Sequence, residues 1–100
     1  MNYSLVLIPA AEAELLEAWE WYKKESPGLE MKYWDTILST FLKIAKHPSR
    51  FTLAKTGIRV AFVKKFPYKI VFYTNEAMKR VEILAVVHNK RHPSVWRKRI

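Results

Sequence analysis

The 100-residue chain contains no cysteine, no long apolar run and few acidic residues in its second half. Without cysteine it forms neither disulfides nor thiolate metal sites, and its histidines make no recognisable zinc pattern. No apolar run approaches the ~20 residues that span a bilayer, and Met1 to Leu5 lack the basic start of a signal peptide. We therefore expect a cytoplasmic protein with no membrane partner, no metal and no cofactor.

The chain has material for one hydrophobic core. Half of its residues are apolar or aromatic, and 100 residues are too few for two independently folding units. We predict a single domain that covers residues 1–100.

Charge is unevenly distributed along the chain. The first forty residues carry three lysines against seven acids, a net charge of −4, whereas the remaining sixty carry fifteen basic residues against two acids, a net charge of +13. A surface of one sign attracts oppositely charged ligands and disfavours others. The asymmetry predicts a nucleic acid, a ribosome or an acidic protein segment as partner, the alternative being a charge that only keeps the protein soluble.

Two helices are predicted in the first half, after a short strand over residues 2–8 that ends at Pro9. Apolar residues recur at helical spacing from Ala10 to about Glu25. A second helix is expected to follow, with Ser26 as N-cap and Pro27 at its first position, and to end before Pro48. The two helices should form a hairpin.

Three strands are predicted in the second half, after a basic loop over residues 49–56. The expected strands are Ile58–Val63, Tyr68–Thr74 and Arg80–His88, joined by connections of hairpin length. The order β-α-α-β-β-β predicts an α+β fold, with the helical hairpin packed on one face of a small, mainly antiparallel four-stranded sheet.

Strict alternation along these strands divides their side chains between two faces. The face expected under the helices holds Val60, Phe62, Ile70, Phe72, Ile83, Ala85 and Val87. The other holds Arg59, Ala61, Val63, Lys69, Val71, Tyr73, Glu82, Leu84, Val86 and His88. Because one hairpin covers only one side of a sheet, the second face is expected to be uncovered, and an uncovered apolar face predicts a partner.

Several short motifs resemble the RelE/ParE toxin superfamily over nearly the whole chain. They are Tyr3, Ala13 and Leu16, His47-Pro48, Arg59, the run Phe66-Pro67-Tyr68-Lys69-Ile70-Val71-Phe72-Tyr73, the run Ile83-Leu84-Ala85-Val86-Val87-His88, and Arg91, His92-Pro93 and Trp96. The resemblance implies the toxin of a bacterial type II toxin–antitoxin pair, of the kind tied to growth inhibition and plasmid stabilisation, held inactive by an acidic cognate antitoxin.

Two mechanisms follow from the two branches of that superfamily. RelE-like members resemble one another in cutting messenger RNA on the ribosome without a metal, which would give Arg59, His88 and Arg91 catalytic roles. Those members usually carry a catalytic Tyr or His near the C-terminus, whereas the last Tyr here is Tyr73 and the tail offers Trp96. ParE-like members are associated with poisoning DNA gyrase through binding alone, and the missing tail Tyr makes this the leading hypothesis.

A basic nucleic-acid-binding module is the third hypothesis. It ranks below the two toxin mechanisms because no helix-turn-helix or ribonucleoprotein motif is present.

The candidate residues also have structural interpretations. Arg59 can pair with Glu82 across the sheet, and His88 can bond the backbone at a strand end. Helical spacing favours packing roles for four aromatic residues of the helices: Trp19, Trp21, Tyr22 and Trp34. Trp96 can stack on a base, dock the tail onto the sheet or anchor the antitoxin. The residues predicted to bind antitoxin or target are Lys69, Tyr73, Trp96, Arg97 and Arg99.

Overall fold

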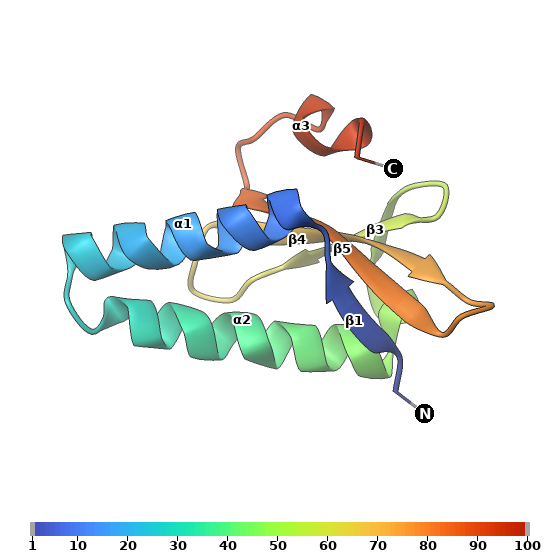
Figure 1. Ribbon diagram of the computed structural model, residues 1–100, viewed down its shortest axis with the longest axis horizontal. Helices are drawn as coiled ribbons and strands as arrows, with labels where there is room; N and C mark the ends of the chain where they lie inside the picture. The colour runs from blue at the N-terminus through green and yellow to red at the C-terminus, as the bar shows by residue number, and fades with distance from the viewer. Residues whose placement is uncertain (1, 100) are drawn as a thin grey trace.

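The computed structural model describes residues 2–99 and shows a helical hairpin packed against one sheet, as predicted (Figure 1). The elements in chain order are β1 (Ser4–Leu7), α1 (Pro9–Glu25), α2 (Leu29–Lys46), a 3-10 turn (Pro48–Arg50), β2 (Thr52–Lys55), β3 (Ile58–Phe62), β4 (Tyr68–Asn75), β5 (Arg80–His88) and α3 (Ser94–Arg97). None of the helices in this described part is long and apolar enough to cross a membrane.

The sheet has five strands in the order β1-β5-β4-β3-β2, one more than predicted. β1 runs parallel to β5, and the other neighbouring pairs are antiparallel. The additional strand, β2, lies in the stretch that we expected to be a loop. All of its residues are exposed at the sheet edge, so it lacks the apolar alternation by which strands are recognised.

Both helices of the hairpin form where the spacing of apolar residues predicts them, although α2 begins two residues later than predicted. Pro9 takes the first position of α1, as expected, where its missing N–H costs no hydrogen bond. Gly28, not Ser26, is the residue before α2, and its φ of 102° is a conformation that suits glycine. Its N–H donates to the Glu30 carboxylate at 2.7 Å, so an acidic side chain two residues ahead holds the turn.

The main core lies between the hairpin and the sheet. Its buried side chains come from both helices, the three central strands and the β3–β4 loop, and they are Ala11, Leu15, Ala18, Tyr22, Tyr33, Ile37, Ile44, Ala61, Val63, Phe66, Ile70, Phe72, Val81, Ile83 and Val86. The β3–β4 loop adds Phe66, whose ring centroid lies 5.0 Å from that of Tyr22 and 5.7 Å from that of Tyr33. This aromatic group fixes the loop beneath the free end of the hairpin.

A bulge in β5 changes which side chains face the helices. Val71 of β4 lies opposite Ala85, whereas the next residue, Phe72, lies opposite Ile83, so Leu84 is an extra residue in β5. Leu84 and Ala85 therefore pack on the same side of the sheet. Every later residue of β5 is on the face opposite to the one that strict alternation predicts.

The predicted division of side chains between the two faces is accordingly wrong for β3 and for the end of β5. In β3 the cause is the register, because Ala61 lies opposite Ile70 and so faces the helices with it. Val60, Ala85 and Val87, which we expected under the helices, pack on the far side. Three residues expected on the far side, Ala61, Val63 and Val86, pack under the helices.

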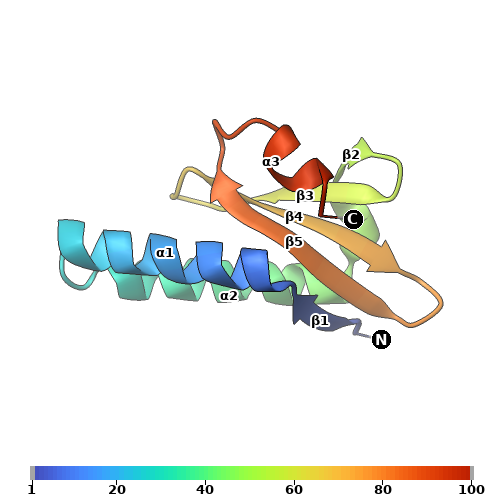
Figure 2. The same cartoon turned by 45° about the horizontal axis from the view of Figure 1, so that its top comes forward.

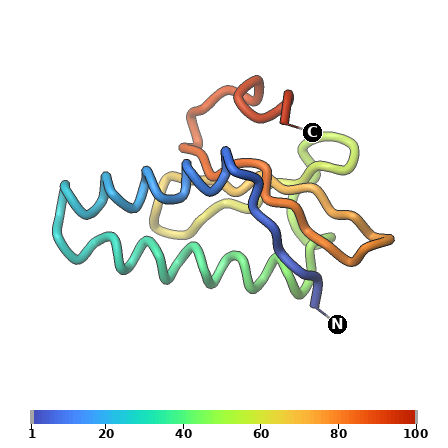
Figure 3. The backbone as a smooth tube through the Cα atoms, in the orientation of Figure 1, coloured from blue at the N-terminus to red at the C-terminus, as the bar shows by residue number. Residues whose placement is uncertain are grey.

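The second face of the sheet is not open, which corrects the prediction of an uncovered apolar face. The C-terminal tail turns back after β5 and places α3 on the side of the sheet opposite α2 (Figures 1 and 2). The tube in Figure 3 shows the same return of the chain across the sheet. Only Phe62 remains as a large exposed apolar residue of that side in β3, with 61% of its surface accessible.

Candidate functional site

Trp96 docks the tail onto the sheet, one of the three roles predicted for it. Its side chain is 4% exposed and belongs to a second core with residues of β3, β4 and β5: Ile58, Val60, Val71, Leu84, Ala85 and Val87. Its indole Nε1 is buried and has no hydrogen-bond partner among the described residues. The anchor therefore relies on apolar packing.

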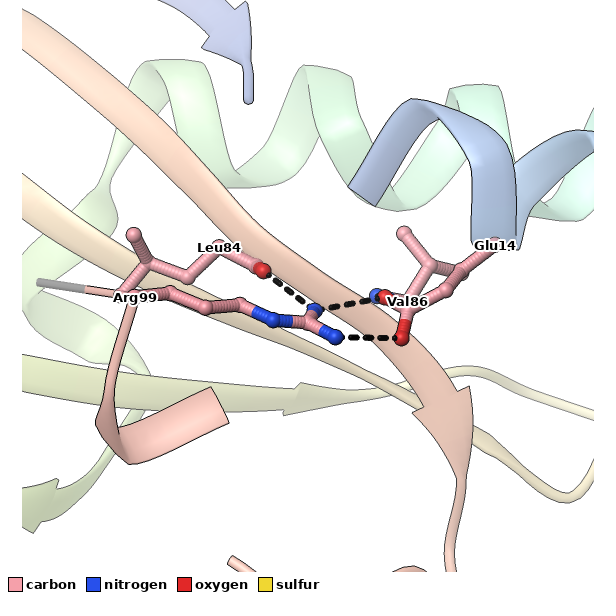
Figure 4. Close-up of polar contacts among 4 residues, drawn as sticks. All are labelled: Glu14, Leu84, Val86 and Arg99. Carbon is pink, nitrogen blue, oxygen red and sulfur yellow. Dashed lines mark hydrogen bonds and ion pairs between the residues drawn. The ribbon is translucent and has the colours of Figure 1, made fainter. Parts of the chain in front are cut away.

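Arg99 fastens the end of the tail to α1 and to the edge of β5 (Figure 4). Its Nη1 donates to Glu14 Oε1 and to the Leu84 carbonyl, both at 2.9 Å, and its Nη2 donates to Glu14 Oε2 at 3.0 Å. The Val86 N–H donates to Glu14 Oε1 at 3.1 Å. Since the pairing of β1 with β5 ends at Ile83, Glu14 and Arg99 satisfy the edge groups that β1 leaves free.

Arg99 therefore has a structural role in the free protein, which sequence reasoning did not assign. No signal in the sequence identified Glu14 as its partner, because the two residues are 85 positions apart.

Arg59 is held by the backbone beside the 3-10 turn. Its Nη1 donates to the Phe51 carbonyl at 2.8 Å. The predicted pairing with Glu82 is wrong, since Glu82 pairs with Arg80 instead, with Oε2 of Glu82 3.6 Å from Nη2 of Arg80. Arg59 is opposite Phe72 of β4, on the helix side of the sheet.

His88 lies at the other end of the same side, opposite Tyr68. Tyr68 and Phe72, the β4 partners of His88 and Arg59, are about 14 Å apart along the strand at ~3.4 Å per residue. The structure therefore does not bring Arg59 and His88 together in one site.

His88 and Arg91 share a cleft between α1 and the end of β5, called here the α1–β5 cleft. This cavity of about 400 Å³ is lined by Glu14, Glu17, Ala18, Trp21, Tyr22, Pro67, Tyr68, Val86, Val87, His88 and Arg91. The Lys90 N–H donates to His88 Nδ1 at 3.1 Å, so a neutral His88 ring carries its proton on Nε2. Of the predicted catalytic residues, the structure brings these two together.

The tyrosine hydroxyls of the α1–β5 cleft remain protonated at neutral pH. Burial raises the pKa of Tyr22, and the nearby Tyr68 raises it further. Burial also raises the pKa of Tyr68, with a smaller contribution from the negative charge of Glu17. Both hydroxyls can therefore donate as well as accept hydrogen bonds.

The remaining predicted binding residues lie on the tail side of the sheet or on the tail. Lys69 is half-buried, and its Nζ lies 3.5 Å from the Arg91 carbonyl, beside the start of the tail. Tyr73 packs against the second core, and Arg97 is exposed on α3. These three residues therefore lie on the side of the sheet that α3 covers or on α3 itself.

A second cavity, on the outer surface of the hairpin, was missed in the sequence. This hairpin groove of about 430 Å³ is lined by Leu16, Trp19, Met31, Trp34 and Asp35. Leu16 is 47% exposed and Met31 is 67% exposed. A search for apolar residues outside the buried stripe of each helix would have found it.

The site contains no grouping suited to a metal. Within residues 2–99, no three His, Asp or Glu side chains come together as potential ligands.

A family model describing the ParE toxin of the type II toxin–antitoxin system parDE matches residues 5–93. The chain belongs to the ParE toxin family. The match includes both helices of the hairpin and the whole sheet except the first residue of β1. No curated protein sequence matches the chain.

Solved structures of toxins have the same fold as this ParE family member. A chain of the chromosomal ParDE system from P. aeruginosa has a TM-score of 0.74 at 18% identity, covering 87% of this chain and 96% of its own. A mutant of the E. coli toxin RelE in the free state has a TM-score of 0.70 at 15% identity, covering 100% of this chain and 99% of its own. A chain of the toxin–antitoxin complex RelBE2 from Mycobacterium tuberculosis has a TM-score of 0.58 at 17% identity, covering 88% and 99%.

Proposed function

We propose that this ParE family toxin inhibits growth by binding an intracellular target, DNA gyrase, and that a cognate acidic antitoxin neutralises it. The family match supports the toxin role. The observation that carries the binding mechanism is the separation of Arg59 from His88 and Arg91.

Cleavage of RNA through the ribose 2′-OH requires a base, an acid and a cation around one phosphate. Here the Arg59 guanidinium bonds the Phe51 carbonyl, while His88 and Arg91 line the α1–β5 cleft. The tail contributes a buried Trp96 and no tyrosine. The geometry thus favours binding over the alternative, a ribosome-dependent endoribonuclease.

We assign two surfaces to the antitoxin. One is the hairpin groove, and the other consists of the basic residues on the tail side of the sheet and on α3. Leu16 and Met31 offer apolar contacts that an amphipathic segment can cover. Lys69 and Arg97 add positive charge, which suits an acidic partner, and Tyr73 lies four residues along β4 from Lys69. Two of the similar structures come from systems described as ParDE and as a toxin–antitoxin complex, in agreement with such a partner.

A supercoiling assay with purified gyrase and a cleavage assay in a translation extract separate the two mechanisms. We expect the wild-type protein to inhibit supercoiling and to leave messenger RNA intact, and we expect added antitoxin to restore supercoiling. Message cleavage that is lost in both Arg59→Ala and His88→Ala, with normal supercoiling, would overturn the binding mechanism.

Antitoxin binding is tested by placing a charge in the hairpin groove. Met31→Asp should weaken antitoxin binding at least about tenfold, because it buries an unpaired carboxylate against apolar side chains. Glu12→Ala, on the exposed part of α1, is the matched control and should bind normally. Equal affinities for both variants would exclude the groove as the antitoxin site.

A further inference from the structure

We propose that the α1–β5 cleft binds an unpaired guanine base of a single-stranded nucleic acid. The cleft volume of about 400 Å³ is within the ~300–1,000 Å³ typical of small-ligand sites. This binding is independent of whether gyrase is the toxin's target.

Trp21 provides a free aromatic surface at this cleft. The sequence suggested a packing role for Trp21, but its side chain is 55% exposed, whereas the adjacent Tyr22 is 7% exposed. The two rings meet edge to face, with centroids 5.0 Å apart and planes at 84°. This contact holds the indole in place, and the exposed remainder of its surface is available for a base to stack on.

Tyr68 and His88 add two further rings to the lining of the cleft. Their ring centroids are 5.7 Å apart with planes at 69°, and both residues are half-buried. The Tyr68 hydroxyl and the His88 Nε2–H add hydrogen-bond donors to this lining. The lining therefore combines aromatic rings with polar groups, as recognition of a base requires.

Glu17 gives the cleft a preference among bases. It is exposed, and none of the ion pairs formed within residues 2–99 involves it, in contrast to Glu14, which Arg99 occupies. Its two carboxylate oxygens can accept from the adjacent N1–H and N2–H donors of guanine. Adenine, cytosine and uracil do not present two such adjacent donors, so they are bound less well.

Exposed cations that suit a phosphate backbone lie close to the cleft along the chain: Arg91 lines it, and the others are within three residues of a lining residue. Lys90 and Arg91 follow β5, and Lys64 and Lys65 are in the β3–β4 loop. The Asn89 N–H donates to the carbonyl of Pro67 at 2.8 Å, so the two segments are joined beside the cleft. Cations beside aromatic rings are the usual arrangement for binding single strands.

The combination of charges disfavours simpler ligands. An acidic peptide would be attracted by Arg91 but repelled by Glu17 in the same lining. A cationic ligand would pair with Glu17 and be repelled by Arg91. A nucleotide satisfies both, because its backbone is anionic and its base presents hydrogen-bond donors to the carboxylate.

Fluorescence titration of the 100-residue protein with labelled heptamers tests the proposal. The probes are r(UUUGUUU), r(UUUAUUU) and the DNA equivalent d(TTTGTTT), which separates RNA from DNA as the source of the base. We expect the guanine probe to bind more tightly than the adenine probe. Trp21→Leu should weaken binding roughly 5- to 100-fold by removing the stacking surface, and Trp21→Phe should restore most of it.

Two further variants separate base recognition from general attraction to the basic surface. Glu17→Gln should remove the preference for guanine, whereas Glu20→Gln, an exposed carboxylate of α1 that does not line the cleft, should keep it. Arg91→Ala should reduce the dependence of affinity on salt, and Lys98→Ala, outside the cleft, serves as its control.

Binding that is unchanged in Trp21→Leu and in Glu17→Gln would overturn the proposal, as would no binding of any heptamer. Protection from acrylamide quenching by a poly-glutamate peptide, and not by the guanine heptamer, that disappears in Trp21→Leu would assign the cleft to a protein partner. Circular dichroism of each variant confirms its fold. Failure of gyrase inhibition leaves all of these outcomes unaffected.

Discussion

The two faces of the sheet are covered in very different ways. The helices on one face have 17 and 18 residues, whereas the helix on the other has four and contributes one large anchor, Trp96. Because hydrophobic stabilisation scales with the apolar area buried, the helix face holds the domain together and the tail face adds less. A change on the tail face should therefore alter the surface of the toxin with less effect on its folding.

The largest effect is expected in the core under the helices. Phe72 is fully buried between the sheet and the hairpin, and its ring centroid lies 5.9 Å from that of Phe51. Phe72→Ala should lower the free energy of unfolding by about 3–5 kcal/mol, since it leaves a cavity that the packed core cannot fill. Urea denaturation measures the change, and a loss below ~1 kcal/mol would contradict this assignment of the main core.

A smaller effect is expected for Trp96→Ala, although Trp96 is larger than Phe72. We expect the tail to leave the sheet without unfolding the main core, so the loss should be limited to the free energy of docking, about 1–2 kcal/mol. Binding of a hydrophobic dye should increase because the covered sheet face is then exposed. A loss as large as that of Phe72→Ala would remove the distinction between the two faces.

The Glu14–Arg99 pair should show a measurable coupling between the two faces. Both side chains are less than one-fifth exposed, and together they bond the Leu84 carbonyl and the Val86 N–H. In a double-mutant cycle of Glu14→Gln and Arg99→Gln, we expect a coupling of about 1–2 kcal/mol. The exposed residues Glu12 and Arg97 provide the matched control cycle, whose coupling should be near zero; equal values in the two cycles would contradict the structure.

The smallest effect concerns alkaline pH. Burial raises the pKa of Tyr33 above its ordinary value of 10.0, with smaller contributions from Tyr68 and Tyr22. Since the folded-state pKa is the higher one, the contribution of Tyr33 to stability is intact below pH 10 and is lost as the pH rises beyond it. The free energy of unfolding of the Tyr33→Phe variant should therefore fall less steeply above pH 10 than that of the wild type.

The same variant also loses the hydrogen bond to the Leu15 carbonyl, 3.1 Å long. It should therefore be about 1 kcal/mol less stable at neutral pH. Urea denaturation as a function of pH measures both effects, and identical pH profiles for wild type and Tyr33→Phe would contradict the burial of this hydroxyl.

The sequence predicts the elements whose signals are local. The end of α2 before Pro48 and the strands at Tyr68 and Arg80 follow from proline chemistry and apolar patterns. The bulge at Leu84 has no comparable signal, because it depends on the register between β4 and β5. One unpredicted residue was enough to assign Ala85 and Val87 to the wrong face.

The site was less predictable than the fold because its contacts are long-range. The predicted catalytic set contains His88 and Arg91, which share a cleft, and Arg59, which does not line it. The sequence left three roles open for Trp96: stacking on a base, docking the tail and anchoring the antitoxin. Only its burial in the second core of the folded protein distinguishes docking from the other two. Trp21 was expected to pack, yet its position on the surface of α1 leaves it exposed.

Growth after induced expression without antitoxin tests most directly whether this toxin acts by binding. We compare the wild type with an Arg59→Ala/His88→Ala double variant, after confirming that both accumulate as folded protein. Both should arrest growth, because neither side chain is needed for a binding mechanism. Normal growth with the wild type would contradict the toxin role, and arrest that is lost only in the double variant would contradict binding in favour of cleavage.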